Sequence, residues 1–333
     1  MSSRSLIILP DDSAAPILEA IERASNSLRI KMFVFSDPKL LERVIAAHRR
    51  GVKVKVMLNP ARRSGEDDNA VSRKKLLAAG VEVRDSSPHV ELTHEKSMVV
   101  DDKVAFVKSL NWTTKNLTET RDYAVVTDHH HEVNEIIKCF DADWNKEKFE
   151  PKDEIRLIWC PINGRERITR FIDEAQHTLF VENERYQDQV IIEHLVRAAK
   201  RGVKVHVLAR PVHKLDADKL VEAVGGLRIL DDVGVKVHKL KGLQLHGKML
   251  LRDGVAAIVG SINLAPGSFD SRRELAIEVH DDEVIEELQD LAHHDWENSH
   301  PLGLSDDELM ADLDDSEEAA RLALTDDHHK GKD

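Results

Sequence analysis

The chain carries one short pattern twice, in the same register and 152 residues apart. His94 and Lys96 begin the first copy, His246 and Lys248 begin the second, and an aspartate follows each lysine after four intervening residues. Downstream residues match at the same offset without a gap: Ser109, Asn111, Asp122 and Asp143-Trp144 correspond to Ser261, Asn263, Glu274 and Asp295-Trp296. We interpret this agreement as a tandem duplication in which each half supplies one histidine and one lysine.

The duplication extends to the scaffold that precedes each motif. Residues 38–50 have apolar positions at helical spacing, with Pro38 suited to the first turn and Gly51 suited to the C-terminal cap. Residues 52–56 then alternate as a strand does, and residues 188–202 and 203–208 repeat the same order. The pattern predicts an α/β fold: a duplicated α/β sandwich, each half a mostly parallel sheet flanked by helices, with the halves related by a pseudo-two-fold axis.

We expect three segments along the chain. The first half covers residues 1–147, the second covers residues 155–304, and an acidic C-terminal tail covers residues 305–333, with the charged stretch 146–154 as the linker. The tail holds 11 acidic and three basic residues, so it supplies eight of the 13 net negative charges. Ser305 and Glu308 have the spacing of a capping box, but the tail is interpreted as a solvated terminus. The body is therefore mildly acidic, and its net charge does not exclude an anionic substrate.

Each motif is predicted to lie on a β-hairpin. Strand-forming runs flank a turn at Asp101-Asp102 in the first copy and at Asp253-Gly254 in the second. Residues i and i+2 of a strand point to the same face, so the histidine and the lysine of each copy project together. Asp101 and Asp253 fall at the turns and are assigned a structural role. The residues that end the returning strands are expected beside the histidines, where they would bind substrate: Ser109, Asn111, Ser261 and Asn263.

Paired His-x-Lys-x4-Asp motifs, each followed by Ser-x-Asn, resemble the signature of the phospholipase D superfamily. The resemblance covers the chain to about residue 300. It implies a phosphodiester hydrolase or transphosphatidylase with one composite active site within a single chain, so that no oligomer is required, and it favours His94 as the nucleophile. The first half departs from the family pattern twice, with Lys108 where glycine is usual and Asp122 where glutamate is commoner.

The chemistry of phosphodiester cleavage explains why these residue types are needed. Two lysine ammonium groups, with hydroxyl and amide donors, can neutralise the nonbridging oxygens without a metal ion. One neutral imidazole attacks phosphorus to give a phosphohistidine, and the other, protonated, donates to the leaving alkoxide. Carboxylates must hold the two rings in these opposite states. Asp122 and Glu274 are the candidates, each 28 residues after the histidine of its own half.

No cofactor, no metal site and no transmembrane segment are predicted. The histidine run at residues 129–131 is interpreted as a solvated turn, because further zinc ligands cannot be placed beside it. Cys139 and Cys160 offer no disulfide framework, which favours a reduced, cytoplasmic location. The apolar run at residues 6–9 is too short for a secretory signal and is expected to form the first strand. No stretch approaches about 18 apolar residues, so any membrane contact would be peripheral.

The substrate class is left between two alternatives. Residues 235–250 are basic, and further basic residues are expected in the two loops at the carboxyl ends of strands, where they would suit either phospholipid headgroups or nucleic acid: Arg62, Arg63, Arg73, Lys74, Lys75, Arg210, His213 and Lys214. Full duplication in one chain looks more like the phospholipase D and cardiolipin synthase relatives, so headgroup hydrolysis or transfer on a phospholipid is preferred. A nuclease acting on DNA or RNA is the alternative. A non-catalytic binding module is disfavoured because both His/Lys pairs are intact.

Overall fold

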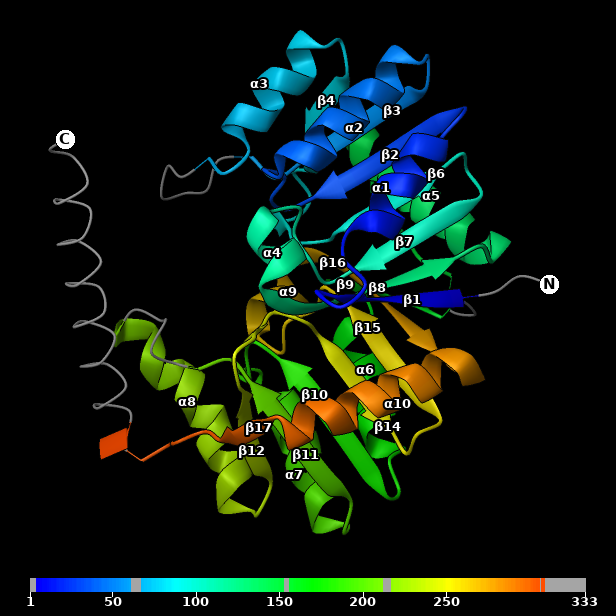
Figure 1. Cartoon of the computed structure of the whole chain (residues 1–333). Coiled ribbons are helices and arrows are strands. Elements are labelled where there is room, and N and C mark those ends of the chain that lie inside the picture. Colours follow the sequence, from blue (N-terminus) through cyan, green and yellow to red (C-terminus); the bar gives the residue numbers. More distant parts are fainter. Residues whose placement is uncertain (1–3, 61–66, 153–155, 212–216, 306, 309–333) are drawn as a thin grey trace, which may run out of the picture.

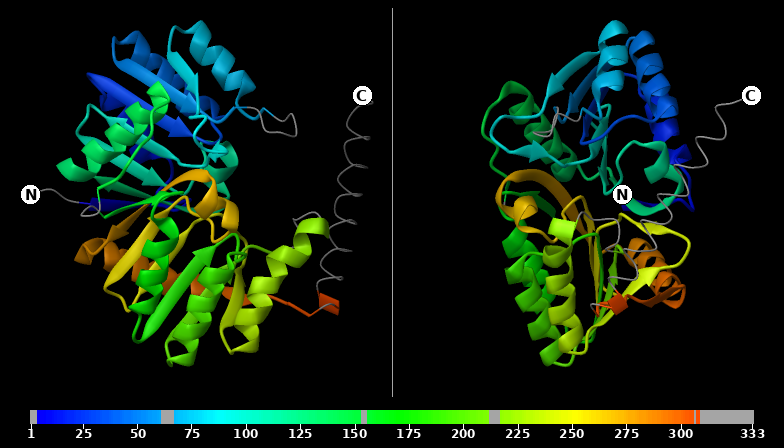
Figure 2. Two further views of the ribbon diagram at one scale, coloured as in Figure 1. Left: turned by 180° about the vertical axis from the view of Figure 1, so that it is seen from behind. Right: turned by 90° about the vertical axis from the view of Figure 1, so that its left-hand side faces the viewer.

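The computed structural model describes residues 4–60, 67–152, 156–211, 217–305 and 307–308. Figures 1 and 2 show two halves of similar build, each made of one sheet and its helices. The first half contains β1 (Arg4–Leu9), α1 (Ala15–Arg23), β2 (Ser27–Met32), α2 (Pro38–Arg49), β3 (Lys53–Leu58), α3 (Ala70–Ala78), β4 (Glu82–Asp85), β5 (Leu92–Thr93), β6 (Ser97–Val100), β7 (Val104–Lys108), α4 (Thr114–Thr118), β8 (Thr120–Thr127) and α5 (His130–Asn145). The second half contains β9 (Leu157–Cys160), α6 (Gly164–Asp173), β10 (Thr178–Asn183), α7 (Gln189–Lys200), β11 (Lys204–Ala209), α8 (Ala217–Asp232), β12 (Lys236–Leu240), β13 (Gln244–Leu245), β14 (Met249–Arg252), β15 (Ala256–Gly260), α9 (Pro266–Asp270), β16 (Arg272–Val279), α10 (Asp282–Glu297) and β17 (Ser299–Pro301).

The two sheets have the same strand order. The first runs β1-β8-β7-β6-β2-β3-β4, and the second runs β9-β16-β15-β14-β10-β11-β12 with β17 added at the edge. The α/β class and the duplication are therefore confirmed. The expectation of mostly parallel sheets is wrong: along these two orders, β2-β3-β4 and β10-β11-β12 pair in parallel, and the other neighbouring strands pair antiparallel. Helical crossovers join the parallel strands, whereas a tight turn joins β6 to β7, and such a turn can connect only antiparallel strands.

The first βαβ unit of each half begins its helix in the same way. Asp37 precedes α2, and its carboxylate accepts the N–H groups of Lys39 and Leu40 at 3.0 and 2.9 Å. Asp188 precedes α7, and its carboxylate accepts the N–H of Ile191 at 3.1 Å. These caps satisfy amide groups that the first helical turn leaves unpaired. The chain then turns back into the sheet at Gly51 and Gly202, whose φ angles of 93° and 94° favour glycine.

The motif hairpins are anchored by the aspartates at their turns. Asp101 has a φ of 52°, and its carboxylate accepts the backbone N–H groups of Ser25, Asn26 and Ser27 at the start of β2. Asp253 has a φ of 53° and accepts three consecutive N–H groups at the start of β10 in the same manner. Each aspartate thus ties the hairpin to the neighbouring strand. This placement, far from the histidines, is the one expected for a structural residue.

Apolar cores lie on both faces of each sheet. Helices α1, α2 and α3 cover one face of the first sheet, and helices α6, α7 and α8 cover one face of the second. The other face of each sheet contributes to a single shared core, which includes residues of β6, β7 and β8 together with residues of β14, β15 and β16 and the helices α5 and α10. The halves are therefore joined by a continuous hydrophobic core and not by a linker alone.

The segment boundaries predicted from the sequence stay predictions. Residues 153–155 of the expected linker and most of the tail lie outside the described residues. At the start of the tail, the Ser305 hydroxyl donates to the Glu308 carboxylate at 2.5 Å, and the Glu308 N–H donates back at 3.3 Å, which is capping-box geometry. Within the described part of the chain, every helix is too short or too polar to cross a lipid bilayer.

Candidate active site

The two histidines lie in one cavity at the boundary between the halves. The cavity has a volume of about 510 Å³, and its lining includes His94 and Asn111 from the first half and His246 and Asn263 from the second. Further lining residues are Phe33, Leu92, Lys115, Asn116, Thr120, Glu184, Arg185, Arg210, Gln244, Leu245 and Arg272. The sequence repeat thus brings its two copies together in space, within one chain.

Each motif crosses to the other half just before its histidine. The two-residue strand β5 pairs with β16, and β13 pairs with β8. The N–H groups of His94 and Glu95 then donate to the carbonyl of Arg273 at 2.9 and 2.8 Å. The N–H groups of His246 and Gly247 donate to the carbonyl of Arg121 in the same way, at 3.2 and 2.7 Å. Each histidine is therefore held by backbone bonds against the strand of the opposite half.

This crossing decides which carboxylate contacts which histidine. Glu274 follows Arg273, and its carboxylate lies 2.9 Å from Nδ1 of His94. Asp122 follows Arg121, and its carboxylate oxygens lie 2.7 and 3.0 Å from Nδ1 of His246. The sequence analysis selected both carboxylates but associated each with the histidine of its own half. The structure places each carboxylate beside the histidine of the other half.

Both carboxylates are fully buried and held by hydroxyl groups. Asp122 accepts from Ser109 and Thr120, each at 2.6 Å, and Glu274 accepts from Ser268 at 2.7 Å. Burial alone would raise the pKa of each carboxyl, but the adjacent histidine, the nearby motif lysine and these hydroxyl donors hold both pKa values below the usual range. Both groups are therefore carboxylates. Each can accept a hydrogen bond from the protonated Nδ1 of a histidine, which leaves Nε2 as the reacting atom of that imidazole.

The four residues expected to bind substrate take two different positions. Asn111 and Asn263 line the cavity, and among the described residues their side-chain Oδ1 atoms have no hydrogen-bond partner. Ser109 and Ser261 are fully buried behind it. Ser109 supports Asp122, while the hydroxyl of Ser261 accepts the N–H of Leu275 at 3.1 Å. The asparagines are thus placed to meet a ligand, and the serines are placed to support the residues behind it.

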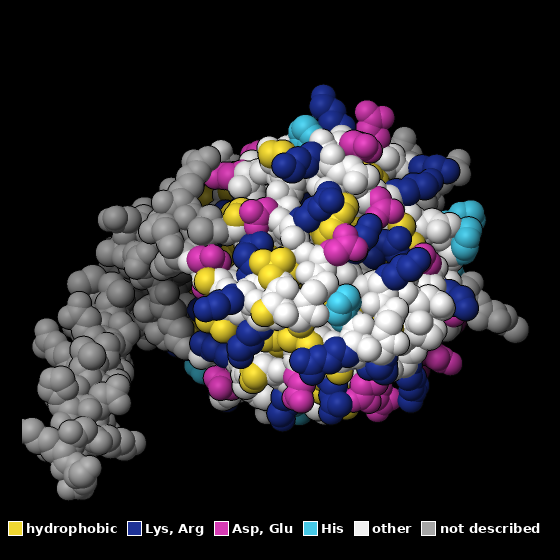
Figure 3. Space-filling view, turned by 90° about the horizontal axis from the view of Figure 1, so that it is seen from above, with side chains coloured by type: hydrophobic (Ala, Val, Ile, Leu, Met, Phe, Trp, Pro, Cys, Tyr) yellow, Lys and Arg dark blue, Asp and Glu magenta, His cyan; other side chains and the backbone are white. Residues whose placement is uncertain are grey.

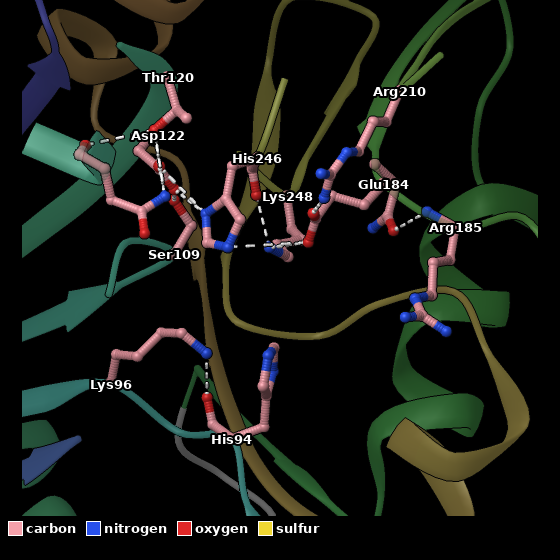
Figure 4. Close-up of polar contacts among 12 residues, drawn as sticks. His94, Lys96, Ser109, Thr120, Asp122, Glu184, Arg185, Arg210, His246 and Lys248 are labelled. Atoms are coloured by element: carbon pink, nitrogen blue, oxygen red, sulfur yellow. Dashed lines mark hydrogen bonds and ion pairs between the residues drawn. The ribbon is translucent and has the colours of Figure 1, made fainter. Parts of the chain in front are cut away.

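The two motif lysines extend beside the histidines, as Figure 4 shows. The ammonium of Lys96 donates to the carbonyl of His94, and that of Lys248 donates to the carbonyl of His246, each at 2.5 Å. Burial, reinforced by the charge of Lys248, lowers the pKa of Lys96 to about 7. Burial and the second cation both weaken the hold of Lys96 on its proton, and a phosphodiester anion beside Lys96 would strengthen it.

The half-sites differ at the residue that follows the second strand of each half. Phe33 follows β2, and its ring lies edge-on to the His94 ring at 4.9 Å between centroids. Glu184 follows β10, and its carboxylate contacts Lys248 at 2.7 Å, Arg210 at 2.8 Å and Nε2 of His246 at 3.7 Å. In Figure 4, His246 accordingly lies between two carboxylates, Asp122 and Glu184. Sequence reasoning missed Glu184, because the equivalent position in the first half is Phe33 and the repeat therefore gives no match there.

This asymmetry gives the two histidines different electrostatic surroundings. Burial lowers the pKa of His94 to about 4, and the charges of Lys96 and Lys248 reinforce this shift against the opposing effect of Glu274. His94 is therefore a neutral imidazole over the whole physiological range. His246 instead has two carboxylates within 4 Å of its ring nitrogens.

Lys108 occupies the position that glycine holds in the second half. There, a Cβ on Gly260 would lie 2.4 Å from the Cα of Ala276, so only glycine fits between β15 and β16. The first half accommodates a lysine, whose side chain is buried with its ammonium 4.3 Å from the centroid of the Trp112 ring. Burial lowers the pKa of Lys108 well below its usual value. The departure from the family pattern thus leaves the hairpin intact.

The residues beneath the cavity include two buried ion pairs that join the halves. Arg273 donates to both carboxylate oxygens of Asp143 at 3.0 Å, and Arg121 donates to both oxygens of Asp295 at 2.7 and 2.9 Å. Both aspartates belong to the Asp-Trp pair that the two halves share in sequence. They are buried at the ends of α5 and α10, and each clamps an arginine whose carbonyl holds a motif histidine.

Among the described residues, Glu95, Cys139 and Asp143 form the one group with ligand atoms close enough together for a metal ion. The ammonium of Lys31 already fills this space, at 2.9 Å from both carboxylates and 3.5 Å from the thiol. The two carboxylates and the thiol are therefore arranged around a buried lysine and not around a metal ion. His130 and His131 are exposed at the start of α5, and that group does not include them.

The expected basic rim is only partly present around the cavity. Arg210 lines it, but Arg73, Lys74 and Lys75 belong to helix α3 and not to a loop, because that helix begins earlier than expected. Arg62, Arg63, His213 and Lys214 lie outside the described residues. Over the face in Figure 3, basic and acidic side chains are interspersed.

Comparison with known proteins defines the class. Residues 17–144 and 168–296 each match the family described as cardiolipin synthase, PLD-like domain. The chain belongs to this family, and it is a phosphodiester transferase or hydrolase of the phospholipase D type. Cardiolipin synthase B of Escherichia coli (strain K12) is 26% identical over 319 residues, which cover 82% of this chain and 75% of that protein. Mitochondrial cardiolipin hydrolase of Mus musculus is 31% identical over 144 residues, covering 42% of this chain and 61% of that protein.

Solved structures show the same fold. The phosphatidylserine synthase of Haemophilus influenzae Rd KW20 superposes with a TM-score of 0.70 at 10% identity, covering 89% of this chain and 87% of that one. The polyphosphate kinase of Porphyromonas gingivalis superposes with a TM-score of 0.67 at 18% identity, covering 88% of this chain and 50% of that one. At these identities, the likeness extends to the fold alone.

Proposed function

We propose that the protein acts on phospholipids, hydrolysing or transferring a headgroup through a phosphohistidine intermediate and without a metal ion. The observation that carries the proposal is the crossed pair of histidines in one cavity, each with Nδ1 against a buried carboxylate of the opposite half. Such a pair offers two Nε2 atoms to one phosphorus. The preference for a phospholipid rests on the names of the relatives that span most of the chain, which are cardiolipin synthases.

The reaction begins with attack by Nε2 of His94 on phosphorus. His94 has this role because it is neutral, with a pKa of about 4, and lies against the apolar ring of Phe33. As the N–P bond forms, the P–O bond to the headgroup breaks, and His246 gives its proton to the departing oxygen. Lys96, Lys248 and the asparagines Asn111 and Asn263 stabilise the nonbridging oxygens.

The second step reverses these roles. A hydroxyl group, from water or from an acceptor alcohol, attacks the phosphorus of the phosphohistidine while His246 removes its proton. The N–P bond breaks, and His94 is released as a neutral imidazole. Asp122 and Glu184 stabilise the charge that His246 carries before the first step and regains in the second. The same site thus serves hydrolysis or transfer, according to which hydroxyl reaches the cavity first.

The lysines supply the positive charge that metal ions supply in many other phosphodiesterases. The proposal of metal independence rests on Lys96 and Lys248 beside the histidines, and on Lys31, which fills the one group of closely spaced ligand atoms among the described residues. A nucleic-acid substrate finds less support. Phe33 is the one aromatic residue of the cavity lining, and its ring already packs on His94, which leaves little surface for base stacking.

The test uses purified protein with phosphatidylglycerol in one set of reactions and single- or double-stranded nucleic acid in another, all in excess chelator. We expect headgroup release or transfer from the lipid to survive the chelator. His94→Ala and His246→Ala should each abolish turnover, and the double variant should be no worse than either single variant. Cleavage of nucleic acid alone, or restoration by a divalent ion of activity lost in chelator, would contradict the proposal.

A further inference from the structure

A second cavity, of about 720 Å³, lies between helices α7 and α8. Among the described residues that line it, apolar side chains predominate and there is no lysine or arginine: Ile192, Val196, Ile229 and Pro266 are joined by Gly225 and Gly226, while Gln187, Gln189 and Glu193 add polar groups. Ile229 is 51% exposed although it is a large aliphatic residue. We refer to this cavity as the α7–α8 groove. An apolar hollow without cations does not suit a phosphate, but it suits a hydrocarbon chain.

Two segments of chain run from the lining of the catalytic cavity to the lining of the groove. After β10, Arg185 lines the catalytic cavity and Gln187 lines the groove. After β15, Asn263 lines the catalytic cavity and Pro266 lines the groove. Three residues span at most about 11 Å. The N–H of Gln187 donates to the carbonyl of Leu264 at 2.8 Å, so the two segments lie side by side.

Two consecutive glycines in α8 keep the groove open. Glycine is among the least favourable residues inside a helix, so a packing or functional reason is needed for each. Gly226 has a packing reason, because a Cβ there would lie 1.9 Å from the carbonyl oxygen of Tyr186. Gly225 has none: a Cβ built on it meets no atom within 4 Å. A larger side chain at this position would occupy open space that the glycine leaves free.

We propose that the α7–α8 groove binds an acyl chain of the phospholipid whose phosphodiester lies in the catalytic cavity. This inference rests on the proposed function, because it takes the substrate to be a lipid. A phospholipid carries hydrocarbon chains within a few bonds of its phosphorus, which matches an apolar groove whose lining residues follow two residues of the catalytic cavity, Arg185 and Asn263, by two and three positions. A nucleic acid carries no comparable group. The groove therefore gives the second half a role in selecting the diacylglycerol side of the substrate.

The test fills the groove without disturbing the catalytic residues. Gly225→Leu places a side chain in the open space and replaces glycine with a better helix former, so the fold is retained. Val71→Leu is the matched control: Val71 is 66% exposed on α3, the helix that corresponds to α8 in the first half. Both variants are compared with the unmodified protein on monomeric phosphatidylglycerols with acyl chains of about four to about eight carbons, and on bis(p-nitrophenyl) phosphate, which has no acyl chain.

In the unmodified protein, kcat/KM should rise about fourfold for each methylene that enters the groove. Gly225→Leu should flatten this rise, mainly through KM, and should leave turnover of bis(p-nitrophenyl) phosphate unchanged, while Val71→Leu keeps the full dependence. An unchanged dependence in Gly225→Leu would overturn the inference and assign the groove to another occupant, such as residues 309–333 or a second copy of the chain. An equal loss on every substrate would overturn it too. Turnover of the nitrophenyl ester without turnover of any phospholipid would instead refute the proposed function itself.

Discussion

Replacing Glu274 should disable His94, the histidine of the opposite half. The carboxylate of Glu274 lies 2.9 Å from Nδ1 of His94, and both side chains are buried. Attack on phosphorus converts the neutral imidazole of His94 into a positively charged phosphoimidazolium. Glu274→Gln keeps the size of the side chain but removes the negative charge that this cation needs. The variant should therefore slow formation of the phosphohistidine, whatever the leaving group.

The size of this effect follows from the geometry. Two unit charges about 4 Å apart attract each other by about 4 kcal/mol at an effective dielectric constant of about 20. Because each ~1.4 kcal/mol of barrier changes a rate tenfold, loss of the Glu274 charge should slow the first step about 10³-fold. Asp122→Asn acts on His246, which donates a proton to the leaving oxygen. Its effect should be about 10²–10⁴-fold for an alkyl leaving group.

The assay separates the two roles by the choice of leaving group. Single-turnover kinetics are measured with an alkyl phosphodiester and with a nitrophenyl phosphodiester, whose leaving group departs without protonation. Glu274→Gln should be equally slow with both substrates, as His94→Ala should be. Asp122→Asn should regain most of its rate with the nitrophenyl ester, as His246→Ala should. If instead Glu274→Gln were rescued by the nitrophenyl ester and Asp122→Asn were not, the crossed assignment of carboxylates to chemical roles would be refuted.

Three further results are expected. Asp143→Asn should lower the free energy of unfolding by about 3–5 kcal/mol in urea titrations, because buried cations lose their partner, whereas Glu166→Gln, in an exposed i,i+4 pair, should change it by less than about 0.5 kcal/mol. The kcat/KM for an anionic diester should fall as the pH rises through about 7, because Lys96 then loses the charge that holds the phosphate. Lys96→Arg should move this decrease in kcat/KM to higher pH, and a decrease that stays at the same pH would assign the titration to another group. Glu184→Gln should lower KM for the same diester, because the carboxylate 2.7 Å from Lys248 no longer competes with the substrate, and a higher KM would show that Glu184 helps to bind it.

The fold could be predicted from the sequence wherever the pattern is local. Helix spacing, glycine caps and the turns at Asp101 and Asp253 lie within short windows, and the repeat supplies each window twice. The direction of the sheet strands could not be predicted in the same way, because the βαβ units dominate the periodicity while the hairpins β6–β7 and β14–β15 contribute short apolar runs. Such runs do not reveal their pairing partner, and these hairpins make most of each sheet antiparallel.

The same limit applies to the candidate site, where local patterns could be predicted and long-range pairing could not. The histidines, lysines and carboxylates repeat at fixed spacing, so the sequence could name them. Their crossed pairing depends on β5 and β13, two-residue strands that no periodicity can detect. The arginine that precedes each carboxylate also repeats, in Arg121-Asp122 and Arg273-Glu274. In the structure, the carbonyl groups of these two arginines hold the motif histidines of the opposite halves. The buried cluster that Lys31 forms with Glu95, Cys139 and Asp143 has no counterpart in the second half, so the repeat gave no signal for this cluster.

The differences between the halves are what allow one site to perform two roles. Two identical half-sites would give their histidines similar surroundings and similar proton affinities, whereas the reaction needs one neutral and one protonated imidazole at the same moment. Duplication supplies the two imidazoles, and the crossed backbone pairing makes each depend on the opposite half. Divergence at one position then makes the surroundings of the two imidazoles different, because Phe33 gives His94 an apolar neighbour while Glu184 gives His246 a second carboxylate. It follows that exchanging these two residues would give His246 the apolar neighbour and His94 the second carboxylate, and so would reverse the asymmetry of the site.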